Sequence, residues 1–455
     1  MELLEINITP FELFKKLRHK SGTILLESTM QHHDLGSRSI IVTDPVAIIS
    51  FENGELFNYK DGDRNKITED PLEYLKSILN QYKTNEDGEE FSGGLVGYFS
   101  YDFGCSFENV KLTKPESTNL PEIFFGVYDW GLTYNHTTQK WMIAGVDDVR
   151  PYMKLIKDSV EGRHQPPIPS LISVSDQVHI EVKSNYSRNE YLKKVEKAKR
   201  YIAEGDIYQV NLSQQFSGDI NIPPLVLYKR LREMNPAPFS ALMCVGENDW
   251  VLSSSPELFL DVQRKNVETR PIKGTIRRGK TPEEDEKLKR ELFKSPKDNA
   301  ELLMIVDLER NDLNRVCKKG SVNVHDLKMV ETYASVHHLV ARICGELLDD
   351  CDIVDLIVSA FPGGSITGAP KIRAMQIIDE LEPNKRGVYT GAIGYIGFNK
   401  SAKFNIAIRT MTYESGKVTV GVGGGIVADS DPEKEFQETL DKAAAMFRAL
   451  SVEVK

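Results

Sequence analysis

Short stretches rich in β-branched and aromatic residues recur along the first third of the chain. They cover residues 23–29, 39–51 and 93–103, and each is bounded by Gly, Asp or Pro. That pattern is typical of β-strands joined by turns. The sequence therefore predicts a strand-rich region over residues 10–148.

A polar, proline-containing segment separates this region from the rest of the chain. Residues 149–186 include Pro166, Pro167 and Pro169 among polar neighbours. Such a composition indicates an exposed linker.

A helix is predicted directly after the linker, because Ser187 and Glu190 have the S-x-x-E spacing of a capping box. Apolar residues then recur at helical spacing as far as Gly205, namely Tyr191, Val195, Ala198 and Ile202. Beyond this helix, strands and helices mix without a regular βαβ order. Residues 187–450 are therefore predicted to form an α+β region.

Composition narrows the class of protein. The chain has 455 residues, 40% of them hydrophobic and 27% charged, as in globular proteins large enough to need no disulfides. Its five cysteines form no CxxC pair, which favours a reducing compartment. The acidic N-terminus does not resemble a signal peptide, and no apolar run approaches the roughly 18–20 residues that span a bilayer. The basic residues are scattered and the net charge is −10, which indicates neither nucleic-acid nor membrane binding. We expect a cytoplasmic protein.

The C-terminal segment is predicted to be a helix with an acidic face. Asp431 suits the N-cap and Pro432 the first helical position. Glu435, Glu438 and Lys442 follow at i, i+3 and i+7, so they share one face. The two carboxylates could bind a hard divalent cation, although a solvated acidic face is the simpler interpretation of this helix alone.

A second acidic pair, Asp298 and Glu301, has the same spacing directly before an apolar run. Acids at the edge of a buried segment need a partner, and a shared Mg²⁺ ion would supply one. The charged stretch that follows, residues 307–312, is interpreted as a structural cluster of salt bridges.

Two glycine-rich stretches lack the features of nucleotide-binding loops. Residues 421–426 follow an alternating strand but precede another strand-like stretch rather than a helix. Residues 361–371 lack the GK[ST] ending of a P-loop. The first run is either a tight turn or a backbone that approaches a small ligand and donates N–H groups to a carboxylate.

Lys273 lies between Ile272 and Gly274 in strand-like sequence. It is either a surface residue or a buried amine, and the surface interpretation is the simpler one. If the side chain is buried, desolvation lowers its pKa and makes it a nucleophile. Keeping a lysine neutral at pH 7 requires a shift of about 3.4 pK units, or roughly 4.6 kcal/mol. A nearby carboxylate would oppose that shift unless it keeps its own proton.

Taken in order, these segments resemble the chorismate-utilising enzymes, which include the large subunits of anthranilate and aminodeoxychorismate synthases and the isochorismate and salicylate synthases. The resemblance is strong over residues 187–450 and looser over residues 10–148. Its motifs are GDIYQVNLSQ (205–214), SSPEL (254–258), RPIKGT (270–275), AELLMIVDLERND (300–312), HHLVARICGEL (337–347), FPGGSITGAPKIRAMQIIDELEP (361–383), RGVYTGAIGY (386–395), IAIRT (406–410) and GVGGGIVADSDPEKEFQETLDKA (421–443). It implies an α+β fold with two large antiparallel sheets packed as a sandwich and flanked by helices.

The resemblance also implies a Mg²⁺ site and a chorismate site. Glu301 and Glu438 would bind Mg²⁺, with Asp298 and Glu435 acting directly or through waters. Asp298 stands where anthranilate synthases tend to carry a longer Glu. The remaining positions match groups that contact the substrate, and they are Gln209, Thr275, Ser365, Tyr389, Arg409, Gly423, Gly425 and Lys442.

Two positions distinguish the members of this family. Water-adding members carry a lysine base where this chain has Gln209, which argues against isochorismate or salicylate formation. Anthranilate synthases read PIAGT where this chain has Lys273, and a lysine there resembles aminodeoxychorismate synthases. In those enzymes the lysine is thought to add at C2 of chorismate as the C4 hydroxyl leaves, and ammonia then attacks C4 and expels the lysine. Glu257 matches the general acid at the C4 hydroxyl, and His338 matches an active-site histidine.

The resemblance implies two further partners. The chain has no G-x-C-x-G glutaminase motif, so a separate glutamine amidotransferase subunit is expected to supply the ammonia. Glu27 and Ser28, together with Pro236 and Phe239, resemble a tryptophan pocket, or else they now only pack. The alternatives to chorismate amination at C4 are anthranilate formation and a catalytically silent, tryptophan-binding subunit.

Overall fold

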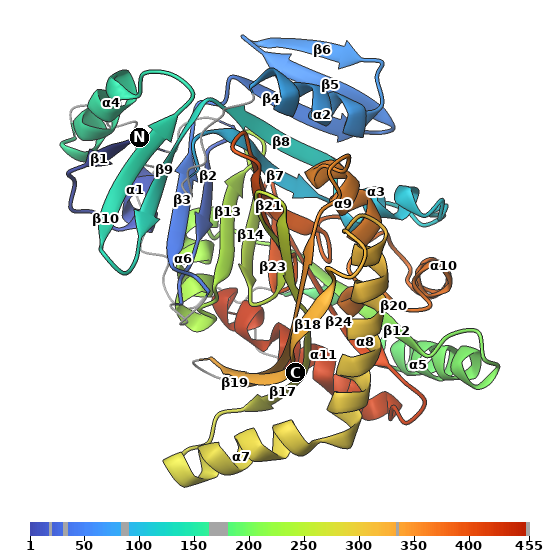
Figure 1. Cartoon of the computed structure of the whole chain (residues 1–455). Coiled ribbons are helices and arrows are strands. Elements are labelled where there is room, and N and C mark those ends of the chain that lie inside the picture. Colours follow the sequence, from blue (N-terminus) through green and yellow to red (C-terminus); the bar gives the residue numbers. More distant parts are fainter. Residues whose placement is uncertain (18–20, 31–34, 83–90, 163–180, 334–335, 452–455) are drawn as a thin grey trace.

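The computed structural model describes residues 1–17, 21–30, 35–82, 91–162, 181–333 and 336–451. Within these ranges the chain forms two antiparallel sheets of twelve strands each, with helices packed on their outer surfaces (Figure 1). The predicted α+β fold with two large antiparallel sheets is confirmed.

The first sheet combines strands from both ends of the chain. Its order is β1 (Glu2–Leu4), β10 (Lys140–Gly145), β9 (Trp130–Asn135), β3 (Arg38–Val42), β2 (Ile24–Glu27), β13 (Phe239–Cys244), β14 (Asp249–Ser255), β23 (Thr410–Glu414), β24 (Lys417–Ile426), β12 (Gln209–Asp219) and β11 (Lys183–Ser184), with β20 (Gly368–Ala369) also paired to β12.

The second sheet also combines strands from distant parts of the chain. Its order is β17 (Ile272–Arg277), β19 (Val336–Glu346), β16 (Asn266–Arg270), β15 (Leu258–Gln263), β22 (Ser401–Ile406), β21 (Ala392–Gly397), β7 (Gly94–Phe99), β8 (Ile123–Tyr128), β4 (Ala47–Glu52), β5 (Glu55–Lys60) and β6 (Asp63–Ile67), with β18 (Asn323–Thr332) also paired to β19.

The helices connect and cover these strands. They are α1 (Pro10–Leu17), α2 (Pro71–Gln81), α3 (Tyr101–Phe107), α4 (Arg150–Val160), α5 (Arg188–Ala203), α6 (Pro224–Met234), α7 (Pro282–Lys294), α8 (Pro296–Asn314), α9 (Ile353–Ala360), α10 (Lys371–Leu381) and α11 (Pro432–Ala449), with a short 3₁₀ helix, η1 (Gly364–Ile366).

The two predicted regions share both sheets, and their proposed boundaries at 10–148 and 187–450 stay predictions. The predicted linker begins with α4 and ends with β11. Pro166, Pro167 and Pro169, on which the linker prediction rests, lie outside the described residues.

The apolar core lies in layers. Between the sheets, Val42 and Met243 of the first sheet pack in one cluster with Val96 and Tyr98 of the second. A second cluster joins the first sheet to α1, α6 and α11, and a third joins the second sheet to α8, α9 and α10. Because successive side chains of a strand point to opposite faces, the strands supply apolar residues both to the layer between the sheets and to the faces that the helices cover.

Local signals in the sequence place several helix ends correctly. Ser187 and Glu190 form the predicted capping box at the start of α5, and Asp431 caps α11. One prediction is wrong in part, because β7 ends at Phe99 and Ser100 caps a helix that begins at Tyr101. All five cysteines lie in described parts of the chain and are free thiols. Among the described residues, no helix is long and apolar enough to cross a bilayer.

Candidate active site

The glycine run 421–426 lies inside β24 and pairs with β12, with Gly424 opposite Leu212. The tight-turn alternative is therefore wrong. On the other edge of β24, pairing with β23 ends at Val420, and no described strand continues it. The backbone groups of the glycine run on this edge are therefore not paired by a described strand.

Glycine is required along this strand because other groups press against it. A Cβ atom on Gly425 would lie 2.8 Å from Gln209 Nε2, and one on Gly423 would lie 2.8 Å from the carbonyl oxygen of Leu212. On the opposite face of the strand, a Cβ on Gly424 would lie 3.4 Å from Glu435 Oε2 and 3.5 Å from Glu438 Oε1. The glycine run therefore lies directly against the acidic face of α11 (Figure 1).

The two acids of α11 differ in their surroundings. Glu435 is buried, and its Oε1 accepts a hydrogen bond of 2.6 Å from Ser430 Oγ, while its Oε2 has no partner among the described residues. Burial raises the pKa of Glu435. Glu438 is 46% exposed and pairs with Lys442 at 2.6 Å. The ammonium of Lys442 also donates to the carbonyl of Gly423 at 3.0 Å.

The second acidic pair comes from α8. Glu301 has a side chain only 15% exposed, and its pKa is raised by burial although Lys273 and Lys297 oppose the shift. The charges of Asp298 and Glu438 act on it in the same direction as burial. Asp298 lies against β17, where a Cβ on Gly274 would come within 2.9 Å of its carboxylate. The acids of the two helices therefore face one common space.

These acids fit a Mg²⁺ ion that shares its coordination with substrate and water. No three acidic, histidine or cysteine side chains of the described residues surround one point closely enough to form a complete protein cage. Mg²⁺ needs no such cage, because it is commonly bound by one or two carboxylates with waters and substrate oxygens. The unpartnered Glu435 Oε2 and the ionised Glu438 supply the hard oxygen donors that this requires. Metal binding itself stays a prediction.

Lys273 on β17 is half-buried, and its amine donates a hydrogen bond of 3.0 Å to the carbonyl of Ser365. Burial lowers the pKa of Lys273, while the carboxylates of Glu301 and Glu257 oppose the shift. The surface interpretation of Lys273 is therefore wrong. Glu257 is itself buried, and burial raises its pKa against the opposing effects of Ser365 and Lys273. A weakly basic amine and a weakly acidic carboxyl thus lie together.

His338 lies on β19, buried, and shares a 2.8 Å hydrogen bond between its Nδ1 and the hydroxyl of Thr275. Burial lowers the pKa of His338 to about 3, and the charges of Arg409 and Lys442 contribute. The imidazole is therefore neutral at physiological pH. Thr275 itself is exposed.

Arg409 lies between the sheet and α11, where its Nη1 donates to the carbonyl of Lys442 at 2.8 Å. Its backbone has a φ of +52°, a conformation that is uncommon for residues other than glycine. The ring of Tyr389 packs on Gly421. Burial lowers the pKa of Arg409, while Tyr389 and Glu438 oppose the shift, and the charge of Arg409 in turn lowers the pKa of His338. Arg409 therefore lies beside Glu438 and Lys442 of α11 and near His338.

β12 carries a row of polar side chains, of which only Gln209 was identified from the sequence. Gln209, Asn211 and Ser213 alternate along one face of the strand, and each is buried. Both amide atoms of Gln209, Oδ1 of Asn211 and Oγ of Ser213 have no partner among the described residues. Buried polar atoms without partners are costly, so this row indicates a place that a polar ligand or water occupies. The alternation Q-x-N-x-S was the available signal.

The charged stretch 307–312 is divided rather than one cluster. Asp307 pairs with Arg310 at 3.1 Å on the surface, whereas Asp312 pairs with Lys371 at 2.6 Å in the interior. Glu309 is buried, and burial raises its pKa to about 8. The interpretation as a salt-bridge cluster holds for the two pairs and is wrong for Glu309.

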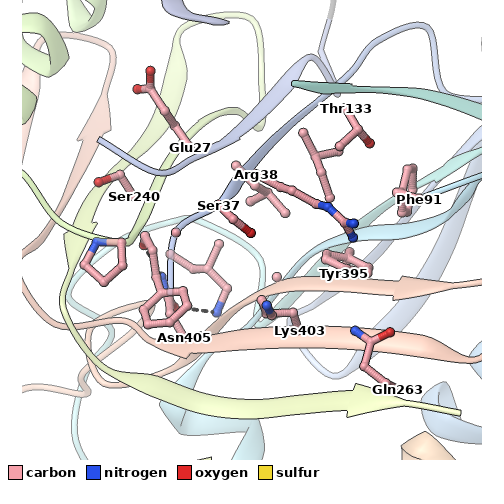
Figure 2. A pocket seen from close by; sticks show the side chains of 17 residues that line it. Glu27, Ser37, Arg38, Phe91, Thr133, Ser240, Gln263, Tyr395, Lys403 and Asn405 are labelled. Carbon is pink, nitrogen blue, oxygen red and sulfur yellow. Dashed lines mark hydrogen bonds between the residues drawn. The ribbon is translucent and has the colours of Figure 1, made fainter. Parts of the chain in front are cut away.

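A separate cavity lies between the two sheets (Figure 2). Of the residues predicted to form a tryptophan pocket, Glu27 and Phe239 line it, and Ser28 and Pro236 do not. The Glu27 carboxylate points away from the other labelled side chains in Figure 2, because it accepts hydrogen bonds of 2.7 and 3.0 Å from Arg232 and 3.1 Å from Tyr228. Tryptophan binding stays a prediction.

Known proteins resemble this chain over nearly its whole length. The family of chorismate binding enzymes matches residues 22–448. Aminodeoxychorismate synthase component 1 of Bacillus subtilis (strain 168) is 40% identical over 449 residues, covering 96% of this chain and 94% of the relative. Anthranilate synthase component 1 of Acetivibrio thermocellus is 38% identical over 469 residues, covering 99% and 94%. The crystal structure of anthranilate synthase component I from Streptococcus pneumoniae TIGR4 has a TM-score of 0.80 at 31% identity, covering 98% and 99%.

Proposed function

The chain belongs to the chorismate binding enzyme family, and we propose that it converts chorismate and ammonia to 4-amino-4-deoxychorismate, the precursor of 4-aminobenzoate. The observation that carries this proposal is the Lys273 amine, half-buried and bonded to the Ser365 carbonyl beside a buried Glu257. A lysine there is the feature that resembles the aminodeoxychorismate synthases. Relatives of both specificities have similar identity, so overall similarity does not choose between them.

The first chemical step uses Lys273 and Glu257. The neutral amine of Lys273 forms a bond to C2 of chorismate while the C4–O bond breaks. Burial raises the pKa of Glu257 and so favours its protonated form, which gives its proton to the departing hydroxyl, and the hydroxyl leaves as water. The lowered pKa of Lys273 increases the fraction of free amine, which this attack requires.

The second step releases the lysine. Ammonia forms a bond to C4 as the C2–N bond to the Lys273 ammonium breaks, which regenerates the neutral amine. The new C4 ammonium returns one proton to the Glu257 carboxylate, and the enolpyruvyl group stays on the product. Two successive displacements give net amination at C4. The neutral imidazole of His338 contributes a polar contact and no charge.

Substrate is held by groups of both signs. Arg409, Lys442 and the free edge of the glycine run are placed to receive the carboxylates of chorismate. Glu301 and Glu438, with Asp298 and Glu435 near them, would hold a Mg²⁺ ion that neutralises the ring carboxylate. We further propose a glutamine amidotransferase subunit as the ammonia source, because the chain carries no glutaminase motif.

Product identification tests the proposal. The purified chain is incubated with chorismate, Mg²⁺ and ammonium at alkaline pH, and the products are analysed by mass spectrometry. We expect aminodeoxychorismate from the wild type and none from Lys273→Ala. Lys280→Ala is the matched control, because this lysine is exposed and lies beyond the end of β17. Glutamine should replace ammonium only when a glutaminase subunit is added.

Other products would assign other functions. Anthranilate with pyruvate would make the chain an anthranilate synthase component, in which Lys273 has no nucleophilic role. If no product formed with or without a glutaminase subunit, the chain would be a silent subunit.

A further inference from the structure

Arg386 and Glu382 form an ion pair buried between the active-site strands and α10. Their side chains are 1% and 3% exposed, and two hydrogen bonds of 2.7 and 2.9 Å join them. We propose that Arg386 is a positioning residue, which fixes the peptide segment that holds the amine of Lys273. This inference rests on the proposed function only in taking Lys273 as the nucleophile.

The guanidinium of Arg386 has a partner for each of its five N–H donors. Two bind Glu382, and the others reach the carbonyl of Ile366 at 2.9 Å, the carbonyl of Asn211 at 2.9 Å and the hydroxyl of Thr390 at 3.4 Å. Its Cζ atom also lies 4.6 Å from the centre of the Tyr101 ring. One side chain therefore joins η1, β12 and the turn at residue 390.

The contact with Ile366 connects Arg386 to Lys273. The carbonyl of Ile366 accepts from Arg386, and the carbonyl of the preceding residue, Ser365, accepts from the Lys273 amine at 3.0 Å. Two consecutive carbonyls of η1 thus accept hydrogen bonds from two basic side chains, Lys273 of β17 and Arg386, which follows α10. Because the segment cannot turn without breaking the bond to Arg386, the oxygen that orients the Lys273 amine has a fixed place.

The same arginine supports the other side of the site. Thr390 has a φ of +61°, which is strained for a β-branched residue, and its hydroxyl donates to the carbonyl of Tyr389 at 2.5 Å. The bond from Arg386 to that hydroxyl helps to hold this turn, and the turn places the Tyr389 ring on the glycine run.

Asp102 of α3 holds the backbone of Arg386 in place. Its carboxylate accepts from the N–H of Arg386 at 3.1 Å and from the N–H of Gly387 at 2.7 Å. The first region of the chain therefore contributes to the catalytic site through one buried side chain. A lysine at position 386 could keep the charge pair with Glu382, but its single nitrogen could not reach the carbonyls of both Ile366 and Asn211.

The variant Arg386→Lys tests the inference. We measure kcat and KM with ammonium, and separately the pH dependence of Lys273 acetylation by mass spectrometry, with the exposed Lys280 as internal reference. In this variant the Ser365 carbonyl is no longer fixed, so the Lys273 amine can approach Glu257. Because that carboxylate raises the pKa of Lys273, we expect the midpoint of Lys273 acetylation to move to higher pH. We expect kcat to fall about tenfold with KM changed less than twofold.

Arg232→Lys is the control, because Arg232 of α6 also makes a two-point contact with a buried glutamate, Glu27, which lines the cavity between the sheets. It should leave the Lys273 midpoint and kcat unchanged. If the melting temperature shows that Arg386→Lys does not fold, the same measurement is made on Glu382→Gln. In that variant we expect a smaller shift of the Lys273 acetylation midpoint, also to higher pH. An unchanged Lys273 midpoint in a folded variant would overturn the proposal. Since the acetylation does not depend on which product forms, it also separates this inference from the proposed function.

Discussion

The ammonium of Lys442 lies 2.6 Å from Glu438 Oε1, one turn earlier on α11. Partial burial alone would raise the pKa of Glu438, but Lys442, with help from Lys297 and Lys273, lowers it instead. Glu438 is therefore ionised while one of its oxygens is already occupied. A substrate carboxylate that attracts Lys442 would leave that oxygen to a cation, so we expect substrate and metal binding to be coupled at this pair.

This coupling predicts the behaviour of Lys442→Gln. Without the competing ammonium, Glu438 is open to a divalent cation, so Mn²⁺ or Mg²⁺ should bind the free protein severalfold more tightly. The gain is modest because the pair is partly exposed, where ion pairs contribute about 0.2–1 kcal/mol. The KM for chorismate should rise, because the variant lacks the Lys442 ammonium that is proposed to bind a carboxylate of chorismate. Titration calorimetry of the metal, without substrate, measures the first effect.

Lys434→Gln is the matched control, since it removes an exposed charge from the first turn of the same helix. It should change neither quantity. Weaker metal binding by Lys442→Gln would show that Lys442 orients Glu438 for the metal rather than competing with it.

The pH dependence of turnover should reflect Lys273 and Glu257. Burial lowers the pKa of Lys273, so the free amine appears below the ordinary lysine range and kcat/KM rises with pH. Burial raises the pKa of Glu257, so the proton donor persists above the ordinary glutamate range, and its loss makes the rate fall. We expect a bell-shaped profile, measured with total ammonium adjusted to keep free ammonia constant.

The titration of His338 should not contribute to the pH dependence of kcat/KM. With a pKa of about 3 it is neutral throughout the measurable range, so His338→Gln should lower the rate without changing the shape of the curve. A limb near pH 6.5 that disappears in this variant would show that the imidazole becomes charged during turnover.

Local sequence signals predicted the ends of elements better than they predicted the site. The capping box at Ser187 and the cap at Asp431 depend on residues within one turn, and both are present. Whether Lys273 is buried depends on Ser365, 92 positions away, which no local pattern reveals. The glycine run likewise had two open interpretations, because its conformation is fixed by pairing with β12, some 210 residues earlier in the chain.

The site was nevertheless predictable in part through the family resemblance. It identified acids on two helices, and the structure places these near Lys273 and Glu257. It did not identify Arg386, whose i, i+4 spacing from Glu382 is also common in exposed ion pairs. Burial alone distinguishes this pair, and burial comes from the convergence of α10, β12 and η1.

The glycine run offers a matched pair of substitutions. Gly424→Ala places a methyl group at ordinary contact distance, 3.4 Å from Glu435 Oε2 and 3.5 Å from Glu438 Oε1. The fold should tolerate it within about 0.5 kcal/mol. The space between the two carboxylates is filled, however, so kcat/KM should fall by roughly tenfold or more.

Gly423→Ala, in contrast, should lower the stability of the protein. Its methyl group would lie 2.8 Å from the backbone oxygen of Leu212, which cannot move without disturbing the ladder between β12 and β24. We expect a loss of stability of about 1–3 kcal/mol. Urea unfolding and steady-state kinetics of both variants separate the two effects, and equal stability of the pair would contradict the assigned packing.

Glu309 should make the stability of the protein depend on pH. Burial raises its pKa to about 8, the nearby carboxylates of Glu257 and Asp312 add to the shift, and Thr269 and Lys371 oppose it. Between its ordinary pKa of 4.5 and about 8, the folded protein therefore holds a proton that the unfolded chain releases. This contribution to stability is fully present below the ordinary pKa and is lost as pH rises through the folded value.

Glu309→Gln carries no such proton, so its free energy of unfolding should lack this decline. Relative to wild type, the variant should gain stability between pH 5 and 8.5 by an amount on the order of 2–4 kcal/mol at most. Urea unfolding at several pH values measures the difference. Glu291→Gln on the exposed face of α7 is the control, and its curve should run parallel to wild type. If the Glu309→Gln curve also ran parallel, Glu309 would be ionised in the folded protein, with Lys371 as the nearest cation to balance it.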